Sequence, residues 1–506
     1  MQNDDPALNC DLLVIGLGIT GAAAALEARA RGADVLVLER ATAGGGTSAL
    51  SDGVIYLGGG TRLQRDLGVQ DDPESLYAFL NAIADVPEKD ILRKFCDGNP
   101  EHFDWLEAQG VPFARILYTD KHLCPSGGEG LYSTGNEKVW PYRNIARPAL
   151  RGHLVTGPAR NCGLKLMEVL LQRCKDVGVR ILGDSRVTRL VQDDTGRVTG
   201  AAFRRDGKDC VAHAIQGVVI ATGGYQMNRE MIAAHNPWTT ENAEPIGTDY
   251  SDGSGIEIAT SIGADVAAMD AIHATAAFYP PAQLIKGIVV NRDGKRFVAE
   301  DSYHGRTAAF IFEQPGQQAY LIVDSETFAY PELAEFFGIE LVDGWSSVAE
   351  MERDLAMPEG ALKATMSAYN GFAAKGEDPE FGKYPDWLQP LDKAPYAAFN
   401  LSVGKTKFFF HSLGGLKVDA DARVIGSNGS PIAGLYAAGS CAAGMVRTPK
   451  GYGSGMTLAN GSFFGRVAAQ HAVGQESRPR VNFTRTPEEP DRALPRSHHK
   501  TTRASD

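Results

Sequence analysis

The 506-residue sequence lacks an excess of positive charge, since 62 Asp and Glu residues outnumber 50 Lys and Arg residues and the formal net charge is -12. This acidity argues against nucleic acids and anionic membrane surfaces as partners, because both attract basic proteins. The sequence also lacks an apolar run long enough to span a bilayer. Its first ten residues, MQNDDPALNC, contain no Lys or Arg, which is not the pattern of a secretory signal. We therefore expect a cytoplasmic protein without a membrane span.

Cysteine is scarce and follows no motif. The seven cysteines are an odd number, are scattered along the chain and include no CxxC pair. This usage excludes a disulfide framework and a zinc site of the usual spacing, so we expect reduced thiols and no metal.

The first 39 residues carry a complete dinucleotide-binding unit. An apolar strand over Leu12 to Ile15 leads into a GxGxxG pattern, an alanine-rich helix and a second apolar strand that ends at Glu39. Of the glycines, Gly16 makes the tight turn, Gly18 lets the backbone approach a pyrophosphate, and Gly21 lets the helix pack close to the strand. The helix N-terminus then faces the phosphates, and the acid stands where a ribose hydroxyl is bound. The pattern predicts an α/β fold with a Rossmann-like domain.

Four further segments favour FAD over NAD as the dinucleotide. The small-residue loop Ala41 to Gly53 can lie along the ribityl chain, and Arg180 to Ala202 alternates in the manner of a β-meander. Strand Val218 to Ile220 enters the small-residue turn Ala221 to Gly224, and Gly434 to Ser440 is a second strand of this kind. The residues predicted to contact FAD are Gly16, Gly18, Gly21, Glu39, Arg40, Thr47, Ser48, Gly53, Val187, Ala221, Thr222, Gly223, Gly439, Ser440, Met456, Thr457 and Leu458.

The length of the chain exceeds that of one typical core, so we expect more than one domain. The composition changes between about residues 271 and 410, where aromatic and charged segments and new strands occur. We therefore predict that residues 1–271 and 411–474 form the FAD-binding domain and that 272–410 form an inserted α+β catalytic or capping domain. The polar segment 475–506 is expected to be a tail.

The order of motifs resembles that of the flavoprotein superfamily of succinate dehydrogenase, fumarate reductase and the 3-ketosteroid dehydrogenases. The motifs are VIGLGITG, ATGG, VVNRDGKRFVAED, HSLGGLKVD and GLYAAG, and they cover the chain up to residue 474. Three further motifs, GVIYLGGGT, EDSYHGR and GYGSG, resemble the Δ4-(5α) type of 3-ketosteroid dehydrogenase most. The resemblance implies FAD, held non-covalently because GGGTSALSDG lacks the superfamily's flavin-linking histidine. It also implies a departure from fumarate reductases, since Arg306 is displaced by two residues from their catalytic arginine.

Desaturation of a cyclic ketone removes a proton from the α-carbon and a hydride from the β-carbon, so it needs an oxyanion site, a base and a hydride acceptor. We predict that the phenol of Tyr452 and an amide in the turn from Gly455 to Thr457 stabilise the carbonyl oxygen. The resemblance implies that Tyr303 and Ser454 remove the α-proton, and flavin N5 accepts the hydride. Tyr56, His411 and Gly455 are the candidate substrate-binding residues. Structural alternatives remain for two of these side chains, because Tyr303 can be a packed ring and Ser454 a helix cap.

The preferred function is therefore FAD-dependent desaturation of a 3-ketosteroid at C4–C5. One alternative is the same chemistry on a small cyclohexanone or oxocyclohexane carboxylate, with His411, His304 or Arg306 binding the carboxylate. Others are a fumarate-reductase-like alkene reductase and a flavin-binding regulatory protein without activity. The electron acceptor is a quinone, a protein or oxygen, and the sequence predicts no oligomeric state.

Overall fold

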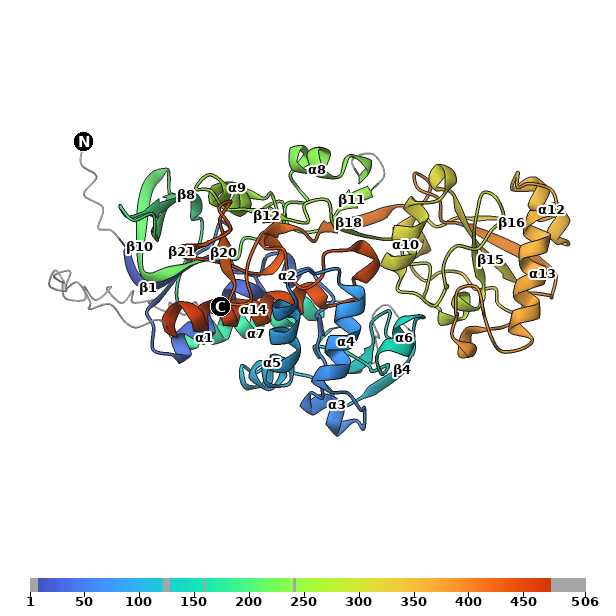
Figure 1. Ribbon diagram of the computed structural model, residues 1–506, viewed down its shortest axis with the longest axis horizontal. Coiled ribbons are helices and arrows are strands. Elements are labelled where there is room, and N and C mark those ends of the chain that lie inside the picture. Colours follow the sequence, from blue (N-terminus) through green and yellow to red (C-terminus); the bar gives the residue numbers. More distant parts are fainter. Residues whose placement is uncertain (1–7, 122–127, 159–160, 240–242, 475–506) are drawn as a thin grey trace, which may run out of the picture.

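The structure is a computed structural model that describes residues 8–121, 128–158, 161–239 and 243–474. The molecule is elongated, with a mostly parallel sheet at one end and an antiparallel sheet at the other (Figure 1). The predicted α/β fold, a Rossmann-like sheet with a β-meander and an inserted α+β part, is confirmed. The predicted tail 475–506, the first seven residues and Cys124 lie outside the described residues.

The parallel sheet has the order β7-β2-β1-β10-β21, which is that of a dinucleotide-binding fold. Its inner strands form because they are continuous apolar runs that are buried on both faces, as in VLVL of β2. The strands are β1 (Leu8–Ile15), β2 (Val35–Leu38), β7 (Arg180–Leu182), β10 (Lys208–Ile220) and β21 (Pro431–Ala437), with β20 (Arg423–Ile425) antiparallel at the edge.

A β-meander continues from this sheet. β8 (Arg186–Gln192) pairs with β9 (Val198–Arg205), and β9 pairs with the first half of β10. The meander therefore begins six residues later than the sequence pattern indicated, because β7 pairs with β2 in the parallel sheet instead. The second half of β10 is the strand that was predicted to enter the small-residue turn.

Three helices pack at this end of the molecule: α1 (Ile19–Ala30), α7 (Cys162–Asp176) and α14 (Met456–Gly474). α1 lies between the other two and contacts both. The run Ala22 to Ala25 is fully buried, since small side chains let α14 approach α1 closely. α14 begins two residues before the predicted Leu458. Its first turn therefore lies directly after the GYGSG motif.

A layer of short strands and helices lies beside the parallel sheet, below the centre of Figure 1. Its strands are arranged in the order β3-β6-β5-β4. These elements are β3 (Val54–Tyr56), β4 (Leu117–Lys121), β5 (Leu131–Ser133), β6 (Gly152–Leu154), α2 (Gly46–Ala49), α3 (Arg62–Asp66), α4 (Pro73–Ile83), α5 (Lys89–Ala108) and α6 (Tyr142–Ile145).

The antiparallel sheet at the far end has the order β14-β15-β17-β16 and packs against α12 and α13. It consists of β14 (Ile288–Asn291), β15 (Ala319–Asp324), β16 (Leu341–Trp345) and β17 (Tyr396–Asn400), with α10 (His304–Phe312), α11 (Ala334–Phe337), α12 (Val348–Asp354) and α13 (Ala361–Ala373). The chain enters this part through β13 (Ile272–Thr275) and leaves through β18 (Phe408–Ser412), which pair with each other. We propose the predicted boundaries at 272 and 410, both of which fall in these two strands.

The remaining elements surround these sheets. They are α8 (Arg229–His235), α9 (Ser254–Thr260), β11 (Ala243–Pro245), β12 (Val266–Ala267) and β19 (Gly415–Leu416), with the 3-10 helices η1 (Pro237–Thr239), η2 (Ala282–Lys286), η3 (Pro315–Gln317), η4 (Pro385–Trp387), η5 (Gly439–Cys441) and η6 (Pro449–Gly451).

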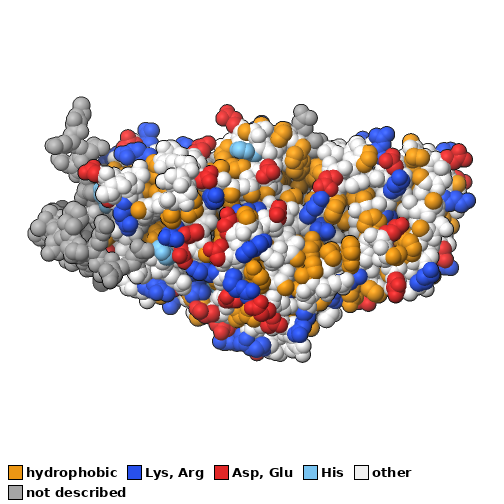
Figure 2. All heavy atoms as spheres, viewed as in Figure 1, with side chains coloured by type: hydrophobic (Ala, Val, Ile, Leu, Met, Phe, Trp, Pro, Cys, Tyr) orange, Lys and Arg blue, Asp and Glu red, His pale blue; other side chains and the backbone are white. Residues whose placement is uncertain are grey.

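The face in Figure 2 carries acidic and basic side chains interspersed, with hydrophobic areas between them. No helix in the described ranges combines the length and the apolar composition needed to cross a membrane. The same residues include no group of three or more His, Cys, Asp and Glu side chains able to hold a metal ion. The cysteines other than Cys124 are free.

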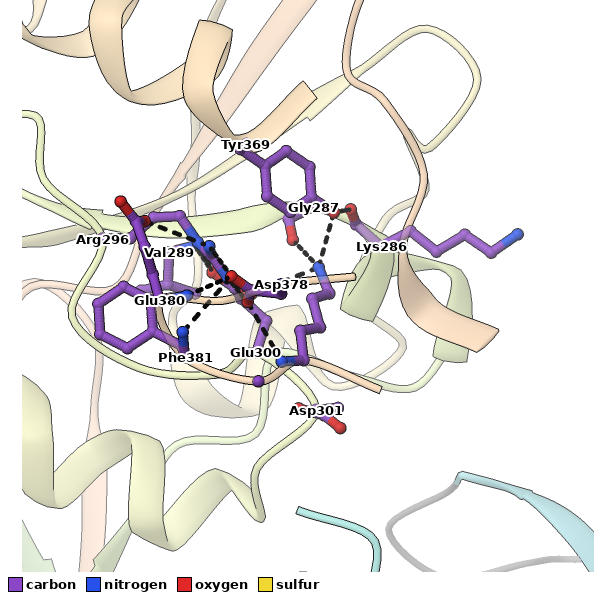
Figure 3. Close-up of polar contacts among 12 residues, drawn as sticks. Lys286, Gly287, Val289, Arg296, Glu300, Asp301, Tyr369, Asp378, Glu380 and Phe381 are labelled. Carbon is purple, nitrogen blue, oxygen red and sulfur yellow. Dashed lines mark hydrogen bonds and ion pairs between the residues drawn. The ribbon is translucent and has the colours of Figure 1, made fainter. Parts of the chain in front are cut away.

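A buried cluster of charges holds the far end together (Figure 3). The Arg296 guanidinium, 6% exposed as a residue, donates to Glu300 at 3.0 and 2.9 Å and to Asp378 at 3.3 and 2.9 Å. Lys383 donates to the hydroxyl of Tyr369 at 3.1 Å and lies 3.4 Å from the Glu300 carboxylate. Burial alone would raise the pKa of Glu300, but the charges of Arg296 and Lys383 lower it below its ordinary value. Two cations and two carboxylates thus neutralise one another in the core.

Replacing Asp378 with alanine should destabilise the protein by about 3–5 kcal/mol, because it leaves one excess positive charge buried. The free energy of unfolding from urea titration measures the loss. Glu74→Gln, which breaks an exposed pair with Arg93, is the matched control and should leave the stability nearly unchanged. Equal stability of the Asp378→Ala variant and the wild type would contradict a structural role for the cluster.

Candidate functional site

The three fingerprint glycines form a turn that excludes side chains. Gly16 has φ +96°, and a Cβ there would lie 2.5 Å from the Ala221 carbonyl oxygen. A Cβ at Gly21 would lie 2.0 Å from the Gly16 carbonyl oxygen, so helix α1 and strand β1 approach each other only with glycine here. Gly18 is the N-cap of α1 and carries no side chain over the helix N-terminus. The turn is thus a bare cradle at a positive helix end, which fits the pyrophosphate of a dinucleotide.

Glu39 lies at the end of β2, directly beside this turn. Its carboxylate accepts hydrogen bonds from the backbone N–H groups of Leu17 at 2.7 Å and Ala41 at 2.8 Å. Burial raises its pKa, and these hydrogen bonds partly offset the rise. The acid is therefore held against the glycine turn, and its contact with a ribose hydroxyl stays a prediction.

The loop that follows β2 packs against the same turn. Ser48 accepts a hydrogen bond from the N–H of Ile19 at 3.2 Å, and the Thr47 hydroxyl lies 3.1 Å from that of Ser251. Arg40 forms an ion pair with Asp252. Each of the three predicted residues in this loop thus contacts a segment close to the fingerprint or to the turn after β10.

The other predicted cofactor residues lie in five places. Gly53 and Gly223 have φ of +73° and +82°, and Val187 lies on β8 of the meander. The Thr222 hydroxyl is buried without a hydrogen-bond partner. Ala221 continues β10, while Gly439 and Ser440 follow β21, and Met456, Thr457 and Leu458 form the first turn of α14.

A pocket joins the last two of these places. Its lining includes Gly439, Ser440, Met456 and Thr457, all predicted from the sequence, together with the ring of Tyr452. The predicted end of the cofactor site and the predicted oxyanion residue therefore share one cavity. The bare glycine cradle fits the pyrophosphate of FAD, and residues of β1–α1, η5 and α14 would hold the cofactor.

Gly21→Ala should yield a folded but colourless protein. The new methyl group would push α1 away from β1 at the phosphate cradle, so the protein should lose its FAD. The ratio of flavin absorbance at 450 nm to protein absorbance measures this loss. Gly371→Ala is the control, because it lies in α13 with no atom within 4 Å of the added carbon, and it should stay yellow. Full flavin content in the Gly21→Ala variant would contradict the assignment of the cradle.

Tyr452 lies between η6 and the turn that starts α14. Its hydroxyl accepts a hydrogen bond from the Thr457 hydroxyl at 3.1 Å, which leaves the phenol proton free to donate. The side chain is buried, and burial raises its pKa above the ordinary value, an effect that the Thr457 contact partly offsets. The phenol is thus neutral and protonated at neutral pH, as an oxyanion donor must be.

Tyr303 lies close to Tyr452 and Ser454 in space. It is the N-cap of α10 and precedes Ser454 by 151 residues in the chain. The Ser454 hydroxyl donates to the Tyr303 hydroxyl at 3.2 Å, and the rings of Tyr303 and Tyr452 lie 6.3 Å apart. Burial and the proximity of Tyr452 raise the pKa of Tyr303 well above its usual range, while the Ser454 hydrogen bond lowers it in part. The three predicted catalytic residues are therefore brought together in the structure.

The three predicted substrate residues differ in their surroundings. Gly455 has φ +86°, and its carbonyl accepts from the N–H of Tyr56 at 3.1 Å, so β3 supports the catalytic turn. The side chain of Tyr56 is 1% exposed, and its buried hydroxyl has no hydrogen-bond partner. The ring of His411 lies 5.0 Å from that of Tyr452, and burial lowers its pKa to about 4.

His273 is a neighbour of the tyrosines that the sequence analysis did not single out. Its ring stacks on Tyr452 at 4.2 Å and lies 5.8 Å from Tyr303 and 5.0 Å from His411. Its Nδ1 is buried without a partner, and burial lowers its pKa well below the ordinary value. A Cβ at Gly305 would lie 2.1 Å from this ring, so that glycine makes room for it. The register of β13 against β18 places His273 opposite His411.

The sequence of the chain is similar to those of several known proteins. The sequence matches the family described as "FAD binding domain" over residues 11–456. It is 30% identical over 494 residues to a 3-oxo-5-alpha-steroid 4-dehydrogenase from Comamonas testosteroni, which covers 85% of this chain and 92% of the relative. It is 27% identical to a probable fumarate reductase from Shewanella frigidimarina over 92% of this chain and 75% of that protein.

A solved structure agrees in the whole fold. The crystal structure of a 3-ketosteroid-Δ4-(5α)-dehydrogenase from Rhodococcus jostii RHA1, in complex with 4-androstene-3,17-dione, is 38% identical in sequence. The match has a TM-score of 0.86 and covers 93% of this chain and 98% of that one. The arrangement of sheets and helices described above is therefore shared along nearly the entire length of both chains.

Proposed function

Because the chain belongs to the FAD-binding flavoprotein family that includes fumarate reductases and 3-ketosteroid dehydrogenases, we propose that it desaturates a 3-ketosteroid at C4–C5. It is an FAD-dependent oxidoreductase of the ketosteroid dehydrogenase type. The observation that carries the proposal is the hydrogen bond of 3.2 Å between Ser454 and Tyr303, next to the free phenol proton of Tyr452.

These residues supply what α-proton removal requires. Tyr452 donates to the ketone oxygen and stabilises the negative charge that develops there. The Ser454 oxygen takes the α-proton while its own proton moves, along the hydrogen bond already present, to a Tyr303 oxygen that has first released its phenol proton to solvent. Bound FAD supplies the acceptor for the β-hydride.

The charges around the site favour a neutral ketone over a ketone that carries a carboxylate. Burial, together with the charge of Lys121, lowers the pKa of His304 to about 3, and that of His411 is about 4, so both rings are neutral. Arg306 donates to the hydroxyl of Tyr142 at 2.8 Å and to the carbonyl of Lys450 at 3.2 Å. The two histidines therefore offer no positive charge to a substrate carboxylate, while Arg306 keeps its charge and commits its Nη1 to two neutral oxygens.

Anaerobic bleaching of the yellow enzyme tests the proposal. A saturated 3-ketosteroid should reduce the flavin rapidly, whereas cyclohexanone and an oxocyclohexane carboxylate should reduce it slowly or not at all. Product analysis should find the new double bond at C4–C5. Faster bleaching by either small ketone would overturn the steroid assignment, and reoxidation of the reduced enzyme only by an activated alkene would indicate a reductase.

We further propose that FAD is held non-covalently and that a quinone, a protein or oxygen reoxidises it. The loop Ala41 to Gly53 contains no histidine to which a flavin could be linked. Acid precipitation should therefore release the yellow colour into the supernatant, and colour that stays with the pellet would contradict this.

A further inference from the structure

One buried side chain is bonded to the backbones of both tyrosines. Asn136 lies between β5 and α6 and is 3% exposed. Its Oδ1 accepts a hydrogen bond from the N–H of Tyr303 at 3.1 Å, and its Nδ2 donates to the carbonyl of Tyr452 at 3.4 Å. These two backbone groups are 149 residues apart in the chain. A single amide group thus spans the two halves of the site.

Both contacts need an amide in this position. The N–H of Tyr303 only donates and the carbonyl of Tyr452 only accepts, so the orientation of the Asn136 amide is fixed. A carboxylate would accept from Tyr303 but would face the Tyr452 carbonyl with a second acceptor. An apolar side chain would leave two buried backbone groups without partners.

The segment that carries Asn136 is itself fixed. The adjacent Glu137 carboxylate accepts hydrogen bonds from the Ser133 hydroxyl at 3.2 Å, the Thr134 hydroxyl at 2.8 Å and the N–H of Gly135 at 3.0 Å. A Cβ at Gly135 would lie 3.0 Å from the Cβ of Tyr303, so the segment packs directly against that tyrosine. The amide of Asn136 is therefore presented by a rigid turn.

We propose that Asn136 is a positioning residue of the reaction, which sets the distance between Tyr303 and the turn that carries Tyr452 and Ser454. The proposal rests on the desaturation proposed above. Asn136 touches neither the ketone nor the flavin in this role. It holds the two phenols in the spacing at which one ketone meets both of them.

The test compares Asn136→Asp and Asn136→Ala with Asn236→Asp. Asn236 is also buried and donates to a backbone carbonyl, but its acceptor is Met269, at 2.9 Å, and neither tyrosine, so it serves as the matched control. At neutral pH both changes at position 136 should slow flavin reduction by a saturated 3-ketosteroid on the order of 10²-fold, with little change in steroid affinity. The control should lose comparable thermal stability and keep its reduction rate.

A pH series separates positioning from a structural defect. A protonated carboxyl group offers one donor and one acceptor, as the amide does, and burial raises the pKa of such a group. The reduction rate of Asn136→Asp, relative to the wild type, should therefore recover as the pH falls, while that of Asn136→Ala should stay low. The proposal would be overturned if the reduction rate of Asn136→Asp, relative to the wild type, did not change with pH. A wild-type rate in Asn136→Asp or Asn136→Ala at neutral pH would also overturn it.

Two readouts keep this proposal distinct from the proposed function. If no saturated 3-ketosteroid bleaches the wild type, the proposed function fails. Crystal structures of the variants then test the positioning role of Asn136 independently of the substrate. The Ser454–Tyr303 hydrogen bond should be broken in crystals of Asn136→Ala and intact in crystals of Asn236→Asp. An intact bond in the Asn136→Ala crystal would overturn the positioning role whatever the substrate.

Discussion

The Tyr452→Phe variant should reduce its flavin about 10²–10³-fold more slowly than the wild type when a saturated 3-ketosteroid is added, which is the usual cost of losing one oxyanion donor. The phenol proton is free because the Thr457 hydroxyl donates to the Tyr452 oxygen. Phenylalanine keeps the ring that stacks on His273, so the cavity should keep its shape. Anaerobic stopped-flow absorbance at 450 nm measures the rate, and the flavin spectrum confirms that FAD stays bound.

Tyr436→Phe is the matched control for this experiment. Tyr436 also has a buried ring, and its hydroxyl has one hydrogen-bond partner, Nδ1 of His471 at 3.0 Å. Losing that hydroxyl should cost some stability and leave the rate of flavin reduction near that of the wild type. If Tyr452→Phe and Tyr436→Phe reduced flavin equally fast, the oxyanion role of Tyr452 would be wrong.

Ser454→Ala and Tyr303→Phe should each slow flavin reduction about 10²–10⁴-fold, the range expected for loss of a general base. Because the two hydroxyls act as one proton-accepting unit, the double variant should be no slower than the slower single variant. A double-mutant cycle on the stopped-flow rates measures this coupling. Rates that multiply would show that the two residues act independently.

The pH dependence of the flavin reduction rate tests whether Tyr303 is the final proton acceptor. Burial raises the pKa of Tyr303 well above its usual range, so only a small fraction of its oxygen is phenolate near neutral pH, and this fraction grows as the pH rises. The wild-type rate should therefore increase between about pH 6 and pH 9, because the fraction of the proton-accepting form increases. Tyr303→Phe should lose this increase. A wild-type rate that falls over this range would contradict Tyr303 as the final proton acceptor.

Local sequence predicted the parts of the site that one segment forms by itself. The cradle of Gly16, Gly18 and Gly21 follows from the backbone requirements of a single βα turn. The same holds for the turn from Tyr452 to Gly455, which leads directly into α14. Short-range geometry decides both turns, but only the glycine cradle was predicted from spacing, since the role of Tyr452 was predicted with the help of the family resemblance.

Contacts between segments that are distant in the chain were harder to predict from the sequence. Tyr303 was placed beside Ser454 only through resemblance to a family, because 151 residues separate them. His273 and Asn136 belong to no motif that the sequence displays. His273 lies at the site because β13 pairs with β18. Asn136 contacts the site through backbone atoms of Tyr303 and Tyr452, and such contacts do not depend on the side chains of those residues. The degree of burial could not be predicted from the sequence either. The ring of Tyr56 is fully buried, whereas its motif suggested that it lines the substrate pocket.

The paired strands β13 and β18 have a structural consequence. They carry the chain into the far end of the molecule and back, and α10 with Tyr303 lies on that side of the crossing, while Ser454 lies on the other. The sheet at this crossing also includes β11, which pairs with β18 on the side away from β13. The hydrogen bond between Ser454 and Tyr303 therefore joins two parts of the chain that these strands connect.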